Sequence, residues 1–385
     1  MKKNSKKTVL LLVIFVLLLI GIFPCTAYGE DELNSEEYNS VLEQYDLSSF
    51  DKLDSESREL LEELGLLDFD YNTIVNFSIS DFLSAVKDVF TGSAQTPLEA
   101  TALILIVILL SSLFQSFKET VNDAGMASAL STVSAVVVAL ILVAKLKGTL
   151  SAACAAISVS ADFVYAFIPA FCIIVASSGS TVTAFSTNTL LISLAQILNF
   201  ISKNIFIPLS NCFLALGICA GIRNELNLGA FIENCKKYLI TAVSVCATAF
   251  VSVLSLKTAV ASRADAIGLR SVRFAINSVV PVIGGAISEG LLSIQAYSSL
   301  IRSSVGVAGI AAVCIVFLPS ILEVAFWRLF LNICSTISRM FSDSSVSSVL
   351  KAFMDALLIM NVILTLSMVT TIISIGILIA ARGSA

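Results

Sequence analysis

The stretch from Ser262 to Gly290 gathers charged and helix-breaking residues in a chain that otherwise avoids charge. Three of its arginines fall within an arc of about 80° if the segment is helical, at about 100° per residue, and an aspartate lies away from that arc. A proline and two adjacent glycines follow, and they favour a kink or break. The pattern predicts a charged helix, a break and a second semi-polar segment. The candidate gating or assembly residues are Arg263, Asp265, Arg270, Arg273, Pro281, Gly284, Gly285 and Glu289.

This charged stretch has two interpretations that the residues alone leave open. Broken helices at membrane depth survive only when they are buried in protein or line water, which favours a lumen or gate element. A cytoplasmic loop with a basic surface, which obeys the positive-inside rule, is the alternative.

Charged residues within or beside the long apolar runs form a second set of candidates. Each costs about 3 kcal/mol or more inside a bilayer unless it is paired or hydrated. Glu323 and Arg328 flank Trp327, which fits either an interfacial anchor or a pore lining. Asp162 and Asp355 each begin an apolar run, which favours placement at helix ends. The full set is Asp162, Glu289, Arg302, Glu323, Arg328 and Asp355.

Residues for catalysis or metal binding are scarce. The chain has no histidine, the commonest general base and metal ligand. None of its nine cysteines forms a C-x-x-C pair, and most lie in apolar runs where a thiol packs as a small hydrophobe. Phosphate-binding loops, nucleophile elbows and nucleic-acid surfaces are also missing from the sequence. We therefore expect a protein that is not an enzyme and that uses no cofactor, metal or nucleic acid.

The composition predicts an integral membrane protein. Hydrophobic residues make up 57% of the 385 residues and charged residues only 13%, whereas a soluble protein carries about 25% charged residues. The mean hydropathy is +0.94. We predict an all-α polytopic bundle of about six to eight transmembrane helices with a broken or re-entrant central segment. Such a protein is embedded in the lipid bilayer.

The N-terminal part is predicted to be exported. Residues 1–29 read as a signal peptide, with four lysines, an apolar core and small residues Ala27 and Gly29 at the cleavage site. An uncleaved anchor is the alternative. Residues 30–95 carry seventeen acidic and three basic residues, which favours the extracytoplasmic side. Within them, Ser78–Phe90 has the spacing of an amphipathic helix that lies on the membrane, docks on a partner helix or packs within its own region.

The spanning helices are predicted in two groups, at 96–256 and 303–385, on either side of the charged central segment 257–302. Simple alternation of these spans places Lys145, Lys147 and the 257–273 cluster outside, against the positive-inside tendency. A re-entrant or doubly spanning piece within 148–222 would resolve this conflict. The predicted spans are Leu98–Phe117, Ala124–Ala144, two helices with a bend in Phe163–Ser202, Ile205–Ile222, Tyr238–Leu256, Ser303–Leu322 and Ala356–Ala381.

Two blocks of sequence resemble a known family. They are "SLKTAVASRADAIGLRSVRFAINSVVPVIGGAISEGL" and "SVGVAGIAAVCIVFLPSI", and the layout of the chain is similar elsewhere. The family is stage III sporulation protein AE of endospore-forming Firmicutes. The resemblance implies a subunit of an eight-protein, secretion-like channel, or feeding tube, in the mother-cell membrane around the forespore. It also implies the other membrane subunits of that complex as partners, a membrane insertase for biogenesis, and no catalytic residue to carry over.

Two other functions remain as alternatives. A secondary transporter would show matched broken helices in its two halves, and only Pro281–Gly285 is a convincing broken element. A membrane scaffold that only holds its partners is the third reading. Small residues recur along 304–312, and such faces let helices pack closely within one chain or between copies, so a homo-oligomer is also a candidate assembly.

Overall fold

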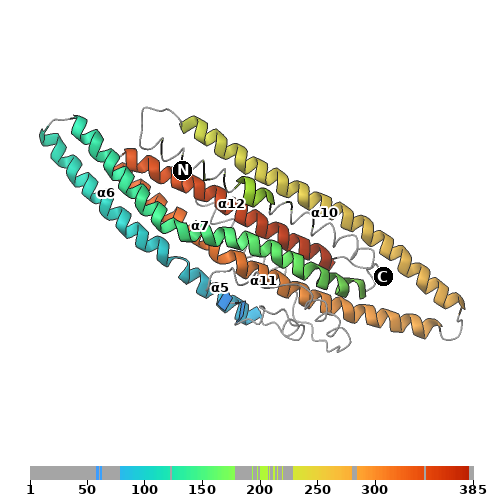
Figure 1. The fold of residues 1–385 in the computed structure, drawn as a ribbon. Helices are drawn as coiled ribbons and strands as arrows, with labels where there is room; N and C mark the ends of the chain where they lie inside the picture. Colours follow the sequence, from blue (N-terminus) through green and yellow to red (C-terminus); the bar gives the residue numbers. More distant parts are fainter. Residues whose placement is uncertain are drawn as a thin grey trace.

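The long apolar stretches fold as α-helices, because a backbone away from water must satisfy its own hydrogen bonds. In the computed structural model these helices lie side by side in one elongated bundle (Figure 1). The elements are α5 (Ile79–Gly92), α6 (Gln95–Val121), α7 (Ala124–Ser177), the short π-helix η3 (Ser202–Phe206), α10 (Gly229–Val279), α11 (Gly284–Met340) and α12 (Ser344–Ala380).

The structure describes residues 58–59, 61–62, 79–121, 124–177, 229–279, 284–341 and 344–380, together with 200–206 and isolated positions between 193 and 219. The predicted signal peptide, with Ala27 and Gly29, lies outside these residues. So do the predicted bend at Ser177–Asn188, apart from Ser177 itself, and most of the predicted span Ile205–Ile222. These features stay predictions.

Helix α11 is the centre of the bundle. It contacts α5, α6, α7, α10 and α12, and 89% of an 18-residue apolar window within Val305–Met340 is buried. The predicted small-residue face is part of this core, since Gly306, Ala308, Gly309 and Ala312 are all buried. Small side chains let neighbouring backbones approach closely, so this face packs α11 within its own chain.

Helix α5 confirms the predicted amphipathic helix and shows what its apolar side contacts. Phe82 and Val89 are buried, and the ring of Phe90 meets Phe326 of α11 edge to face at a centroid distance of 5.2 Å. The helix therefore docks on α11. Leu61, from the predicted acidic region, is fully buried in the same apolar core.

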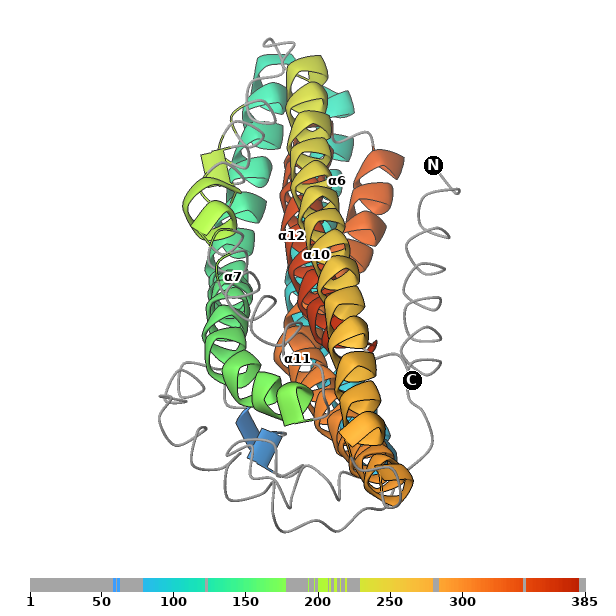
Figure 2. The same cartoon turned by 90° about the vertical axis from the view of Figure 1, so that its right-hand side faces the viewer.

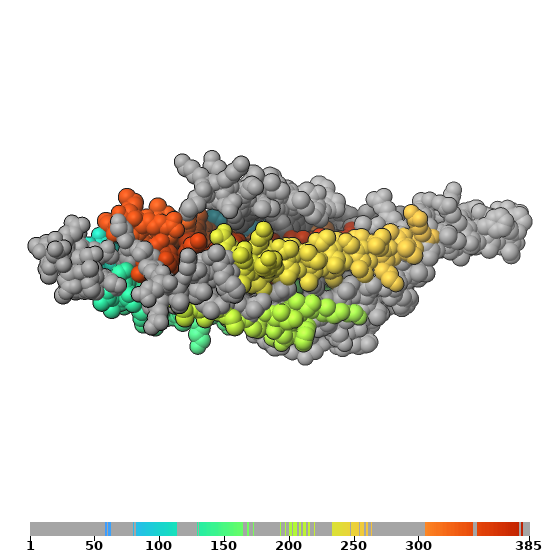
Figure 3. Space-filling view, turned by 90° about the horizontal axis from the view of Figure 1, so that it is seen from above, coloured from blue at the N-terminus to red at the C-terminus, as the bar shows by residue number. Residues whose placement is uncertain are grey.

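Helix α10 lies at the edge of the bundle, on the side opposite α6 (Figures 1 and 2). Only 19% of an 18-residue apolar window within Glu233–Lys257 is buried, and the helix contacts α12 and α11. In the space-filling view it runs along the surface of the molecule (Figure 3). α10 is thus the least enclosed of the long helices that the structure describes.

The helices continue well past the predicted span boundaries. α7 and α10 do not end at Ala144 and Leu256, and α11 begins well before Ser303. At about 1.5 Å per residue, the 54 residues of α7 extend for about 80 Å, whereas the hydrocarbon core of a bilayer is about 30 Å thick. The helices are therefore longer than the predicted spans, because charges such as Lys145 interrupt hydropathy without interrupting the helix.

Five helical stretches in the described residues are long and apolar enough to cross a membrane. This finding agrees with an all-α membrane protein, and the predicted count of six to eight includes spans outside the described residues. The five stretches are Phe82–Leu113, Ser131–Val164, Glu233–Lys257, Val305–Met340 and Ser345–Gly376.

Candidate functional site

The predicted gating residues lie on one helical hairpin at the end of the bundle. α10 carries Arg263, Asp265, Arg270 and Arg273 and ends at Val279, and α11 begins at Gly284 and carries Gly285 and Glu289. The helix ends bracket Pro281, which lies outside the described residues, and they agree with the predicted interruption. The hairpin extends past the ends of α7 and α12 (Figures 1 and 2). Arg263 is exposed.

A second group of polar side chains is buried where α7 meets α11. The hydroxyl of Thr149 donates a hydrogen bond of 2.6 Å to Oε1 of Glu323 and accepts one of 3.0 Å from Nε1 of Trp327. Thr149 is 2% exposed and Trp327 is fully buried. A tryptophan enclosed in this way cannot act as an anchor at the lipid interface, which removes that interpretation of the Glu323–Arg328 segment.

A partly buried ion pair joins α10 to α12 close by. Nζ of Lys236 lies 2.8 Å from Oδ1 of Asp355, and the two side chains are 20% and 16% exposed. Arg328 of α11 also feels the charge of Asp355, and its Nε is buried without a hydrogen-bond partner. Two cations from two helices thus approach one carboxylate.

The two polar groups lie at the same level along the bundle. Asn361 of α12 donates a hydrogen bond to the carbonyl of Ile321 on α11, and the two helices run antiparallel. Asp355 is six residues before Asn361, so it lies opposite residue 327 of α11, at about 1.5 Å per residue. We call this level the polar belt: Glu99, Lys145, Thr149, Lys236, Glu323, Trp327, Arg328 and Asp355.

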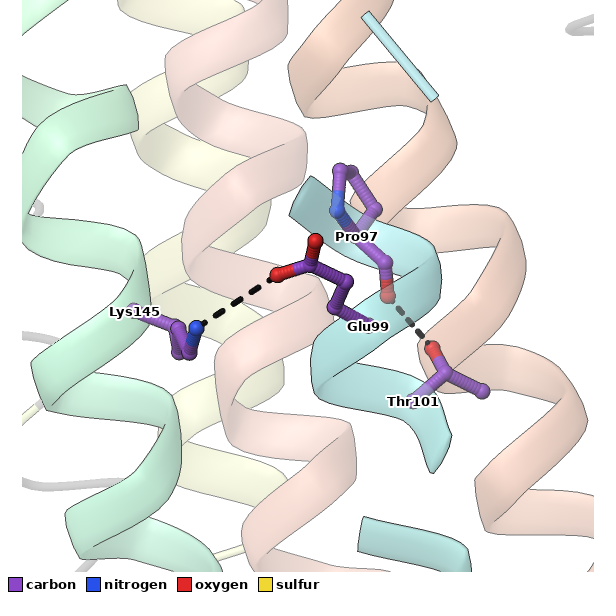
Figure 4. Close-up of polar contacts among 4 residues, drawn as sticks. All are labelled: Pro97, Glu99, Thr101 and Lys145. Atoms are coloured by element: carbon purple, nitrogen blue, oxygen red, sulfur yellow. Dashed lines mark hydrogen bonds and ion pairs between the residues drawn. The ribbon is translucent and has the colours of Figure 1, made fainter. Parts of the chain in front are cut away.

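The outer part of the polar belt is a looser pair between α6 and α7. Glu99 of α6 points toward Lys145 of α7, with 3.7 Å between Oε2 and Nζ (Figure 4). Glu99 is 71% exposed and Lys145 39%, so the pair contributes at most about 1 kcal/mol to stability. The hydroxyl of Thr101, in the same helix, donates a hydrogen bond to the backbone carbonyl of Pro97 in the first turn of α6.

The structure corrects the prediction that two aspartates lie at helix ends. Asp162 lies well inside α7 and Asp355 well inside α12. Their position at the start of an apolar run marks a change in hydropathy that does not end the helix. At Asp355 the facing helix α10 supplies a polar partner, Lys236. Sequence reasoning missed Thr149 and Lys236, and no spacing rule connects either residue to α11 or α12.

The described cysteines agree only in part with the packing role predicted for them. Cys172, Cys314 and Cys334 are buried among apolar side chains, as predicted for packing residues, whereas Cys219 is exposed. Among the described residues, no group of three or more His, Cys, Asp or Glu is placed to hold a metal ion. The polar belt therefore offers hydrogen bonds and paired charges.

Comparison with known proteins assigns the family. The model for stage III sporulation protein AE matches residues 66–382, which is most of the chain. The chain belongs to the stage III sporulation protein AE family. This confirms the predicted resemblance, and the matched range includes both the polar belt and the α10–α11 hairpin.

One relative in the stage III sporulation protein AE family illustrates the distance between members. The stage III sporulation protein AE of Bacillus subtilis (strain 168) is 26% identical over 234 residues. The match covers 59% of this chain, and it spans 59% of the length of that relative. No solved structure matches the chain.

Proposed function

We propose that this chain is a non-enzymatic membrane subunit of a channel that links the mother cell to the forespore and supports the forespore after engulfment. Family membership and the apolar helices support a sporulation protein in a membrane. The channel role rests on one observation, the polar belt that joins α7, α10, α11 and α12 inside the bundle. Charges buried between membrane helices are rare and usually belong to a pathway or a moving part.

The proposed partners are the other membrane subunits of the same assembly, with a membrane insertase for biogenesis. The proposed location is the mother-cell membrane around the forespore, with several crossings by the chain. The α10–α11 hairpin at one end of the bundle, where Arg263 is exposed, is the part of the described chain best suited to contact them, because its arginines lie outside the apolar stretch Glu233–Lys257.

The test is purification of the tagged chain from sporulating cells in mild detergent. The channel proposal expects other membrane proteins in a fixed ratio, and loss of that ratio when Arg263, Arg270 and Arg273 are replaced together by glutamine. The triple variant should still insert into the membrane and should lower spore yield. The matched control replaces Lys203 and Lys257, which are exposed elsewhere.

Two results would contradict the proposal. Strong uptake of a solute by liposomes that hold this chain alone would show a transporter with its own substrate site. Normal spore yield from the triple arginine variant would show that the hairpin has no role in the assembly.

A further inference from the structure

The attachment of α10 to the bundle is unusual for so long a helix. Its apolar stretch is the least buried of the five, and α6 lies on the far side of the bundle. Its inward side chains, Leu239, Val243 and Phe250, are buried. Among the described residues, the ion pair that holds it to its neighbours is Lys236–Asp355. A helix held by one row of apolar contacts and one ion pair can separate from a core that stays packed.

The carboxylate of Asp355 has a second cation available on the core side. Arg328 lies on α11, at the level of Asp355, and senses its charge. The Nε of Arg328 has no hydrogen-bond partner, although the atom is buried. A guanidinium has five donors and its fork matches a carboxylate better than an ammonium does. Arg328 is therefore incompletely bonded while Lys236 occupies Asp355.

We propose that Asp355 is a shared acceptor that exchanges Lys236 of α10 for Arg328 of α11 when α10 moves away from the bundle. In the docked state Lys236 neutralises the carboxylate, and in the undocked state Arg328 does so. Breaking a buried ion pair normally leaves an unpaired charge, and this penalty keeps such helices in place. Here the second cation removes the penalty, so α10 is built to move.

The other charged groups near Asp355 are Glu323, Glu233, Lys237 and Lys351, and Lys351 of α12 is exposed. Glu323 accepts a hydrogen bond from Thr149 on the α7 side of α11. Lys237 and Glu233 of α10 are exposed. α11 and α12 stay fixed in both states, because they pack against each other along most of their length. The proposed movement of α10 does not depend on whether the assembly is a channel.

The experiment measures hydrogen exchange of the full chain in lipid nanodiscs, with peptides that report on α10 between residues 237 and 256. Lys236→Gln should speed exchange there by about tenfold, which corresponds to about 1.4 kcal/mol of docking free energy, without changing α11 or α12. Lys237→Gln is the matched control, since its side chain is exposed and next in sequence, and it should leave exchange unchanged.

Arg328→Met distinguishes the proposed swap of cations at Asp355 from a purely structural role of Arg328. Without the second cation, undocking leaves Asp355 unpaired, so hydrogen exchange in α10 should be slower than in the parent protein. A structural arginine would give the opposite result, because its loss would loosen the bundle. The proposal would be overturned by unchanged or faster hydrogen exchange of α10 in Arg328→Met. Unchanged hydrogen exchange of α10 in Lys236→Gln would overturn it as well.

A second variant keeps the test decisive if Arg328→Met does not fold. Arg328→Lys keeps the positive charge but loses the fork and some reach. In a background without the other reactive cysteines, Leu239→Cys places a thiol on the buried side of α10. Its labelling by a maleimide should be slower with Arg328→Lys than with arginine. Equal or faster labelling would also overturn the proposal.

Discussion

Replacing Thr149 by valine removes the hydroxyl at the centre of the polar belt and leaves the shape of the side chain nearly unchanged. Two interhelical hydrogen bonds disappear together, the one donated to Glu323 at 2.6 Å and the one accepted from Trp327 at 3.0 Å. Since no volume is lost, the effect on stability measures the polar contacts and not a cavity.

The expected cost follows from the burial of the two partners. Hydrogen bonds between membrane helices contribute about 0.6 kcal/mol on average and at most about 1.7 kcal/mol. The bond to the carboxylate belongs at the upper end, because charge-assisted bonds are the stronger class. The indole N–H of Trp327 is fully buried and is left unpaired, which adds about 1–3 kcal/mol. We expect the free energy of unfolding to fall by about 2–3 kcal/mol.

The assay uses the one tryptophan in the chain, which is Trp327 itself. Its emission during titration with sodium dodecyl sulfate in mixed micelles reports unfolding at the polar belt. Thr370→Val is the matched control, since Thr370 is also buried but donates only to carbonyls of its own helix. The free energy of unfolding of the Thr370→Val control should fall by less than about 1 kcal/mol. If Thr149→Val loses no more than Thr370→Val, the hydrogen bonds of the polar belt do not stabilise this bundle.

Three further predictions concern other contacts. Lys236→Asp should lower the unfolding free energy by about 3 kcal/mol, because it places a second carboxylate beside Asp355, and Asp355→Lys in the same chain should recover only part of it, because the new lysine faces Arg328, as measured by thermal unfolding in detergent. Gly148→Ala should raise stability by about 0.5–1 kcal/mol, because a methyl group there meets nothing within 4 Å, and a lower melting temperature would contradict this. Phe90→Leu should weaken the docking of α5 by about 1 kcal/mol through loss of the ring contact with Phe326, seen as faster hydrogen exchange in 79–92.

The sequence predicts the helices well because apolar length and helical spacing are local signals. The helix predicted at Ser78–Phe90 is present at Ile79–Gly92, and α6 ends at Val121 and α7 begins at Ala124, close to the predicted span ends. Both follow from residues within a few turns of each other. Helix ends were less predictable. α11 passes through Pro319, which ordinarily favours a kink or break, since packing on several sides holds the helix together.

The polar belt could be predicted only in part, since its contacts join residues far apart in the sequence. Glu323, Arg328 and Asp355 attracted attention because they are charges near apolar runs. Nothing in the sequence around Thr149 marks it as a candidate, because its partner Glu323 on α11 lies 174 positions further along the chain. Lys236 meets Asp355 across 119 positions. Pairings of this kind depend on tertiary packing, which hydropathy and spacing do not contain.

The length of the bundle also fixes how the polar belt relates to a bilayer. On α6, exposed apolar side chains continue from the belt residue Glu99 as far as Leu113. On α10 they continue from the belt residue Lys236 as far as Val260, in the opposite direction along the bundle. At about 1.5 Å per residue these stretches reach about 21 Å and 36 Å from the belt. A hydrocarbon core of about 30 Å covers about 39 Å of a bundle tilted by 40°. The two stretches therefore cannot both lie wholly within one bilayer. Glu99 and Lys145, the exposed charges of the belt, lie between them. Because an exposed charge in the hydrocarbon core is costly, this level of the bundle must have access to water or to the lipid headgroups.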